Sequence, residues 1–148
     1  MSDLYETDFY AWANEQAAHL RAGRLQAADI AHIAEEIESM GRGERRELTS
    51  RLAVLLAHLL KWQTQPALRE RGWLLAIRQQ RRQVAEELAD NPSLRPRLPA
   101  LLAEAHEDAL LAAQRETGLP ESAFPAVCPW TFAQAMEDEP DALARGIA

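Results

Sequence analysis

The segment from residue 52 to residue 60 constrains the fold of this chain most, because it is apolar on nearly every side of a helix. It reads Leu-Ala-Val-Leu-Leu-Ala-His-Leu-Leu. Only a helix that is surrounded by other helices can bury such a surface. Leu48 extends the apolar stripe upstream, and Pro66 ends it because proline cannot continue a helix. The segment therefore predicts a central helix over residues 44–63.

The other segments of the chain show the same helical pattern, and none shows the alternation of a strand. Their apolar residues recur three and four positions apart, and the abundant Ala, Leu, Arg, Glu and Gln favour helix. The further predicted helices cover residues 8–22, 26–40, 72–89, 130–138 and a segment that starts near Ser93 or Arg97. We predict an all-α fold over residues 1–148: a single-domain helical bundle of four or five main helices plus a short C-terminal helix, with frayed ends at residues 1–6 and 139–148.

Length and composition predict an ordinary cytoplasmic protein. A chain of 148 residues is long enough to bury a core of its own. It has no apolar run of about 18 residues, so we expect no transmembrane helix and no membrane partner. The N-terminus lacks the basic and apolar regions of a secretory signal. Cys128, the single cysteine, excludes an internal disulfide and fits a reducing compartment as a packed hydrophobic residue.

Charge is distributed in three blocks. Residues 1–41 hold 2 Arg against 8 acidic residues, residues 42–85 hold 10 basic against 3 acidic residues, and residues 86–148 hold 4 Arg against 12 acidic residues. One interpretation is that the acidic outer helices pack beside a basic middle. The other is an exposed basic surface for nucleic acid or an acidic partner. Its candidates are Arg69, Arg71, Arg78, Arg81 and Arg82. The net charge of −7 argues against a nucleic-acid binder.

Residues 35–62 contain a candidate polar cluster. Gly41 and Gly43 predict a short turn between two helices, which favours their antiparallel packing. That packing would bring the carboxylates of residues 35–38 to the basic edge of the central helix. A His and a Lys in so apolar a helix are costly unless they are paired or exposed. The cluster consists of Glu35, Glu36, Glu38, Arg51, His58, Lys61 and Trp62.

Two interpretations of this cluster stay open. In the first, its ion pairs and hydrogen bonds fix the register of the helices. In the second, Trp12, Trp62 and Trp73 wall a pocket in which a His beside a carboxylate does acid–base work. No nucleophile with an obvious base is visible, so the catalytic residues and cofactors are unknown.

Asp29, His32 and Glu36 are weak candidates for metal ligands, because their spacing places them on one face of a helix. The alternative is that Asp29 caps the helix and the other two lie on a solvated edge. A second Glu-x-x-His, which a di-metal bundle needs, is missing. We therefore predict no metal site.

Several sequence blocks carry a family resemblance. They are Asp8–Trp12, Glu35–Gly41, His58–Trp62, Glu116–Leu119 and Phe124–Pro129. Together they resemble the bacterial "domain of unknown function 29" family, over residues 4 to about 137. One departure is Gly72, where the family usually has Ser. The resemblance implies a small, mostly helical, cytoplasmic bacterial protein, and it implies no activity.

The favoured interpretation is a non-enzymatic interaction or regulatory module that binds a protein partner or a second copy of itself. The alternative is a small enzyme, or a ligand- or metal-binding bundle, that uses Glu36, His58 and Lys61. A weaker alternative is a nucleic-acid-associated accessory protein that binds through the arginines of residues 72–89.

Overall fold

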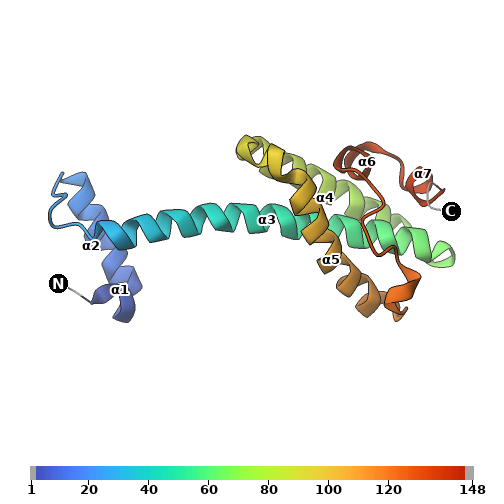
Figure 1. Ribbon diagram of the computed structural model, residues 1–148, viewed down its shortest axis with the longest axis horizontal. Coiled ribbons are helices and arrows are strands. Elements are labelled where there is room, and N and C mark those ends of the chain that lie inside the picture. The colour runs from blue at the N-terminus through green and yellow to red at the C-terminus, as the bar shows by residue number, and fades with distance from the viewer. Residues whose placement is uncertain (1–2, 146–148) are drawn as a thin grey trace. The chain divides into compact units, whose positions relative to one another are not determined.

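The computed structural model describes residues 3–145 of the chain, which form helices joined by short turns (Figure 1). No strand is present among those residues, so the predicted all-α class is confirmed. The structure divides into two compact units, residues 1–43 and residues 44–148. The predicted single domain over residues 1–148 stays a prediction.

The first unit contains α1 (Leu4–Thr7), α2 (Phe9–Arg21) and the first turns of α3. Asp8 separates α1 from α2, and its Oδ1 accepts a hydrogen bond from the N–H of Ala11 at 3.1 Å. This bond caps α2. Gly23 follows α2 with a φ of 72°, a left-handed conformation that glycine adopts readily. The predicted helix over residues 8–22 is confirmed.

Helix α3 (Ile30–Thr64) is one continuous helix of 35 residues. The predicted turn at Gly41 and Gly43 is therefore wrong, and so is the predicted antiparallel packing of residues 26–40 against residues 44–63. Neither glycine has a positive φ. A glycine inside a helix costs only about 1 kcal/mol relative to alanine, and no proline interrupts the hydrogen bonds of this segment. The helical turns on either side of Gly41 and Gly43 are stable enough for the helix to continue through both residues.

The second unit is built around residues 44–64 of α3. Helices α4 (Arg71–Asp90) and α5 (Leu98–Thr117) run beside this part of α3 (Figure 1). Short 3-10 helices, η1 (Pro66–Leu68) and η2 (Pro92–Arg97), precede α4 and α5. The core leucines of α3 are buried, as the predicted central helix requires: Leu48, Leu52, Leu55, Leu56, Leu59 and Leu60.

The C-terminal segment of the second unit contains η3 (Glu121–Ala123), α6 (Phe132–Glu137) and α7 (Pro140–Arg145). Thr131 caps α6, since its side chain accepts from the N–H of Gln134 at 3.1 Å and the Gln134 side chain accepts from the N–H of Thr131. This helix confirms the one predicted over residues 130–138.

The predicted frayed ends cover residues 1–6 and 139–148. Within them, Leu4–Thr7 and Pro140–Arg145 are helical, while residues 1–2 and 146–148 lie outside the described part of the chain. No helix between residues 3 and 145 is long and apolar enough to cross a membrane.

Candidate functional site

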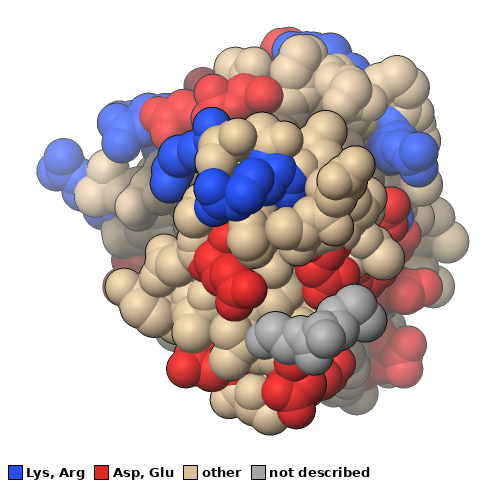
Figure 2. Space-filling view, turned by 90° about the vertical axis from the view of Figure 1, so that its left-hand side faces the viewer, with Lys and Arg blue, Asp and Glu red and all other residues tan. Residues whose placement is uncertain are grey.

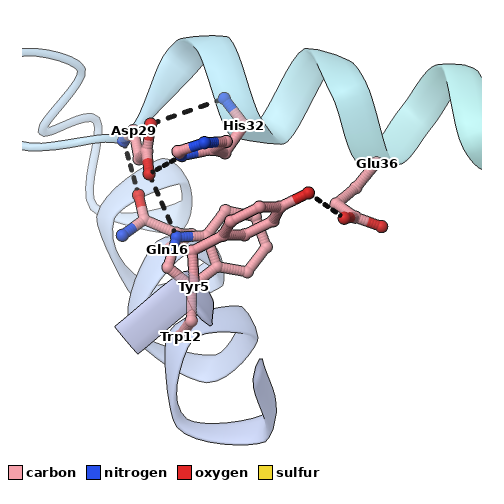
Figure 3. Close-up of polar contacts among 6 residues, drawn as sticks. All are labelled: Tyr5, Trp12, Gln16, Asp29, His32 and Glu36. Carbon is pink, nitrogen blue, oxygen red and sulfur yellow. Dashed lines mark hydrogen bonds and ion pairs between the residues drawn. The ribbon is translucent and has the colours of Figure 1, made fainter. Parts of the chain in front are cut away.

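The first unit is organised around Asp29, which directly precedes α3. Its Oδ1 accepts the main-chain N–H of His32 at 3.4 Å. Its Oδ2 accepts the ring Nδ1–H of His32 at 2.7 Å and the indole N–H of Trp12 at 3.2 Å (Figure 3). The N–H of Asp29 donates to Oε1 of Gln16 at 2.6 Å. Asp29 therefore caps α3, as one of the two interpretations predicted, and ties α2 to it.

Tyr5 connects α1 to the same cluster. Its hydroxyl donates a hydrogen bond of 2.6 Å to Oε1 of Glu36, and its ring stacks on the imidazole of His32 with centroids 3.9 Å apart. The ring of Trp12 makes an edge-to-face contact with the ring of Tyr5, with centroids 4.9 Å apart. Figure 3 shows the ring of Tyr5 reaching across to Glu36 on α3. These contacts hold the short α1 helix against α2 and the first turns of α3.

The hydrogen bonds of the cluster fix its protonation. The hydrogen bond from His32 keeps the pKa of the Asp29 carboxyl below its ordinary value. The hydrogen bond to Glu36 raises the pKa of Tyr5 to about 12. At neutral pH the Asp29 carboxylate thus remains an acceptor and the Tyr5 hydroxyl remains a donor.

An apolar groove lies on the first unit, between α2 and the start of α3. Its volume is about 380 Å³. Several large apolar side chains on its walls are exposed: Phe9 by 51%, Leu20 by 43%, Ile37 by 62% and Met40 by 70%. A contiguous set of large exposed apolar groups is uncommon on a monomeric protein and often marks a binding surface. The groove is lined by Phe9, Trp12, Ala13, Gln16, Ala17, Leu20, Ile33, Glu36, Ile37 and Met40.

The three glutamates of the predicted cluster have partners inside the first unit. Glu36 accepts the hydrogen bond from Tyr5. Glu35 and Glu38 form ion pairs with Arg42, at 3.3 Å and 3.9 Å. All three members of those pairs are about half exposed or more, so the pairs contribute little to stability.

Lys61 and Trp62 form cross-helix contacts in the second unit. The ammonium of Lys61 lies 2.6 Å from Oε2 of Glu116 on α5 and 5.3 Å from the ring centroid of Trp73 on α4. The indole N–H of Trp62 donates to Oδ1 of Asp141 on α7 at 2.8 Å. Both residues therefore join α3 to neighbouring helices, which favours the structural interpretation of the cluster.

Arg51 and His58 also have structural partners. The guanidinium of Arg51 contacts Glu47, one turn earlier, and Gln83 on α4, each at 2.6 Å. The Nδ1–H of His58 donates to the carbonyl of Val54 at 2.8 Å. The seven predicted cluster residues are thus distributed over several separate contacts.

The three tryptophans predicted to wall a pocket have different surroundings. Trp12 belongs to the first unit, where it lines the apolar groove. Trp62 and Trp73 belong to the second unit, where their rings face the cations of Arg69 and Lys61 respectively.

Two arginines of the candidate basic surface are held by neighbouring groups. Arg81 donates to the carbonyl oxygens of Ala135 and Asp138, and burial lowers the pKa of its guanidinium. Arg82 pairs with Glu86 at 3.6 Å on an exposed face. Arg81 therefore fastens the α6 segment to α4 instead of facing a partner.

Arg69 likewise has an internal role, since it donates to the carbonyl of Trp62 at 2.6 Å and lies 3.7 Å from Asp141. Arg71 and Arg78 are exposed. Only part of the predicted basic set is thus presented on the surface.

The three weak candidates for metal ligands, Asp29, His32 and Glu36, do not all bond to one another. Asp29 and His32 bond to each other, whereas Glu36 bonds to Tyr5. Between residues 3 and 145, no group of three or more His, Cys, Asp or Glu side chains is arranged to hold a metal ion.

A pair of carboxyl groups joins α3 to α4 in the second unit. Glu87 shares a hydrogen bond with Glu44, which raises the pKa of Glu87 to about 7; burial and the charges of Glu44 and Glu47 act in the same direction, and Arg51 opposes them. The amide of Asn91 lies 3.4 Å from Oε2 of Glu44 and 3.3 Å from Oε1 of Glu87. This pair was not anticipated from the sequence, because its members lie 43 positions apart.

Cys128 is packed against the core of the second unit, as predicted. Its thiol donates to the carbonyl of Trp130 at 3.4 Å, and burial raises its pKa. A thiol in this state is a weak nucleophile at neutral pH.

Comparison with known proteins identifies the family. A family model described as "Domain of unknown function DUF29" matches residues 4–139. The chain belongs to this family. The resemblance inferred from the sequence blocks is thereby confirmed. Searches of curated proteins and of solved structures gave no match. The description of the DUF29 family names no activity.

Two features of the DUF29 chain escaped the sequence analysis: the role of Tyr5 and the exposed groove. The apolar spacing of residues 9–20 and 30–40 predicts two helices that each have one apolar face, and it does not tell whether that face is buried. The charged Glu36 lies between the apolar residues Ile33 and Ile37. This position indicates that the apolar face is not fully buried. Two of the blocks that carry the resemblance, residues 8–12 and 35–41, contribute to the groove.

Proposed function

We propose that this protein is a non-enzymatic interaction module, and that the groove of the first unit binds an amphipathic helix of a partner protein. The observation that carries this proposal is the exposure of Phe9, Leu20, Ile37 and Met40 around one apolar groove. A helix with apolar residues at three- and four-residue spacing fits a surface of this kind. Burial of the exposed side chains would supply the driving force.

Charge favours a partner helix with a basic polar face. Residues 1–41 hold 8 acidic residues against 2 Arg. On the face shown in Figure 2, acidic side chains lie beside uncharged areas, and basic groups are present as well. Opposite charges speed association and select among partners. A second copy of the same surface would bring two acidic segments together, which disfavours self-association through the groove.

The other candidate functions receive less support. The enzyme or metal-binding alternative uses Glu36, His58 and Lys61, and each of these has a structural partner: Tyr5, a carbonyl of the same helix and Glu116. The nucleic-acid alternative uses arginines of which Arg69 and Arg81 bind main-chain carbonyl groups.

The proposal is tested with synthetic helical peptides. One peptide carries a leucine stripe and lysines elsewhere, and a second carries the same stripe with glutamates. Fluorescence anisotropy of the labelled peptides measures their binding to the whole protein. We expect saturable binding of the lysine peptide and much weaker binding of the glutamate peptide.

Two protein variants separate groove binding from general attraction between opposite charges. Ile37→Glu places a charge in the groove, and Leu111→Glu places the same charge on an exposed position of α5, outside the groove. Both make the protein more acidic, so general attraction would be strengthened in both. We expect Ile37→Glu to weaken binding by at least about tenfold and Leu111→Glu to leave it unchanged or stronger. Equal binding by both variants, or a dimer of the free protein that Ile37→Glu dissociates in analytical ultracentrifugation, would overturn the proposal.

A further inference from the structure

Glu36 is the one charged residue among those that line the apolar groove. It lies on the exposed face of α3 between Ile33 and Ile37, and it is half-buried. A partner helix that fills the groove therefore covers this carboxylate together with the apolar side chains. Glu36 is the place at which the groove can distinguish one apolar helix from another.

The orientation of this carboxylate is set by Tyr5. The Tyr5 hydroxyl binds Oε1 at 2.6 Å, and its ring is held between His32 and Trp12. Within residues 3–145 no group donates a hydrogen bond to the second oxygen, Oε2. In Figure 3 that oxygen points away from Tyr5. One oxygen is thus fixed, and the other remains available to a donor from outside the chain.

Covering a carboxylate with apolar groups removes its water and leaves it unpaired, which costs free energy. A leucine opposite Glu36 would impose that cost. A Lys or Arg in the same place would form a charge-assisted hydrogen bond with Oε2 instead. The same residue thus penalises one kind of helix and favours another.

We propose that Glu36, positioned by Tyr5, selects a partner helix that carries one Lys or Arg within its apolar stripe and fixes the register of that helix in the groove. This inference rests on the proposed function, because it requires a helix to occupy the groove. It adds the identity of the residue that the partner must present.

The test uses two peptides that differ at one position. Both have a leucine stripe and a lysine-rich polar face, and one has a lysine in place of the central leucine. The measured quantity is the ratio of their dissociation constants with the whole protein, so a general loss of affinity does not affect the result. We expect the wild-type protein to prefer the peptide with the central lysine by about tenfold or more.

Variants of the two residues check the mechanism. Glu36→Gln keeps the size of the side chain, and we expect it to abolish the preference and to bind the all-leucine peptide at least as well as the wild type does. Tyr5→Phe removes only the hydroxyl, and we expect it to reduce the preference while circular dichroism shows an unchanged helix content. Glu36→Lys should reverse the preference toward a peptide with a central glutamate.

The outcomes separate the two levels of the proposal. If Ile37→Glu abolishes binding but the wild-type protein binds both peptides equally, the selective role of Glu36 is refuted and the helix-binding groove stands. If Ile37→Glu does not weaken the binding of either peptide, or if neither peptide binds, then both the helix-binding groove and the selective role of Glu36 are refuted. A preference that survives in Glu36→Gln also refutes the inference.

Discussion

The carboxyl pair between α3 and α4 makes the stability of this protein depend on pH in a defined direction. The pKa of Glu87 is raised from 4.5 to about 7 by its hydrogen bond with Glu44. The folded state therefore binds this proton more tightly than the unfolded state does. By linkage, the free energy of unfolding contributed by Glu87 falls as the pH rises from about 4.5 to about 7, and is constant above that range.

The size of the effect follows from the pKa and from solvent exposure. A rise of the pKa from 4.5 to about 7 corresponds to at most about 3 kcal/mol. Because Glu87 is only partly buried, water screens the interaction, and we expect about 1 kcal/mol. For a chain of this length, about 1 kcal/mol shifts the melting temperature by about 2–4 °C.

Glu87→Gln is the informative change, because its amide donates a hydrogen bond to Glu44 at every pH, as only the protonated carboxyl does in the wild type. We expect the variant to be more stable than the wild type by about 1 kcal/mol at pH 8 and nearly equal to it at pH 5. Urea unfolding followed by circular dichroism at both pH values measures the difference. Glu86→Gln is the matched control, since Glu86 pairs with Arg82 on an exposed face.

An equal difference in stability between wild type and Glu87→Gln at pH 5 and at pH 8 would refute the role of the carboxyl pair. The same pH-dependent gain in Glu86→Gln would also refute it, since the effect would then belong to the total charge of α4 and not to the carboxyl pair.

Two further predictions concern the helices themselves. A Cβ at Gly41 or Gly43 meets no atom within 4 Å, so Gly41→Ala and Gly43→Ala should each stabilise a continuous α3 by up to about 1 kcal/mol; a loss of helix content in circular dichroism would contradict the uninterrupted helix. Leu101 is fully buried whereas Leu111 is 63% exposed, so Leu101→Ala should lower the free energy of unfolding by about 2–5 kcal/mol and Leu111→Ala should change it little. Equal losses in urea unfolding would contradict the position of the core.

The sequence was sufficient to predict the helices whose signals are local. The apolar stripe of residues 48–60 placed the central helix, because its surface can be satisfied only by burial. Asp8 caps α2 through a bond to a residue three positions away, and Gly23, which follows that helix, adopts a positive φ. Each of these effects operates within one or two turns of the chain, so the residue type reveals it.

The tertiary structure decided the features that depend on competition or on distance in the chain. The glycine at position 41 disfavours helix by only about 1 kcal/mol, and α3 continues through it. The predicted antiparallel packing required a turn at that position, so it does not occur. Tyr5 meets Glu36, and Glu44 meets Glu87, across 31 and 43 positions. The periodicity that places Ile37 and Met40 on an apolar face is the same for a buried face and for an exposed one. Only the three-dimensional arrangement shows that this face is uncovered, because covering it depends on which other helix lies against it.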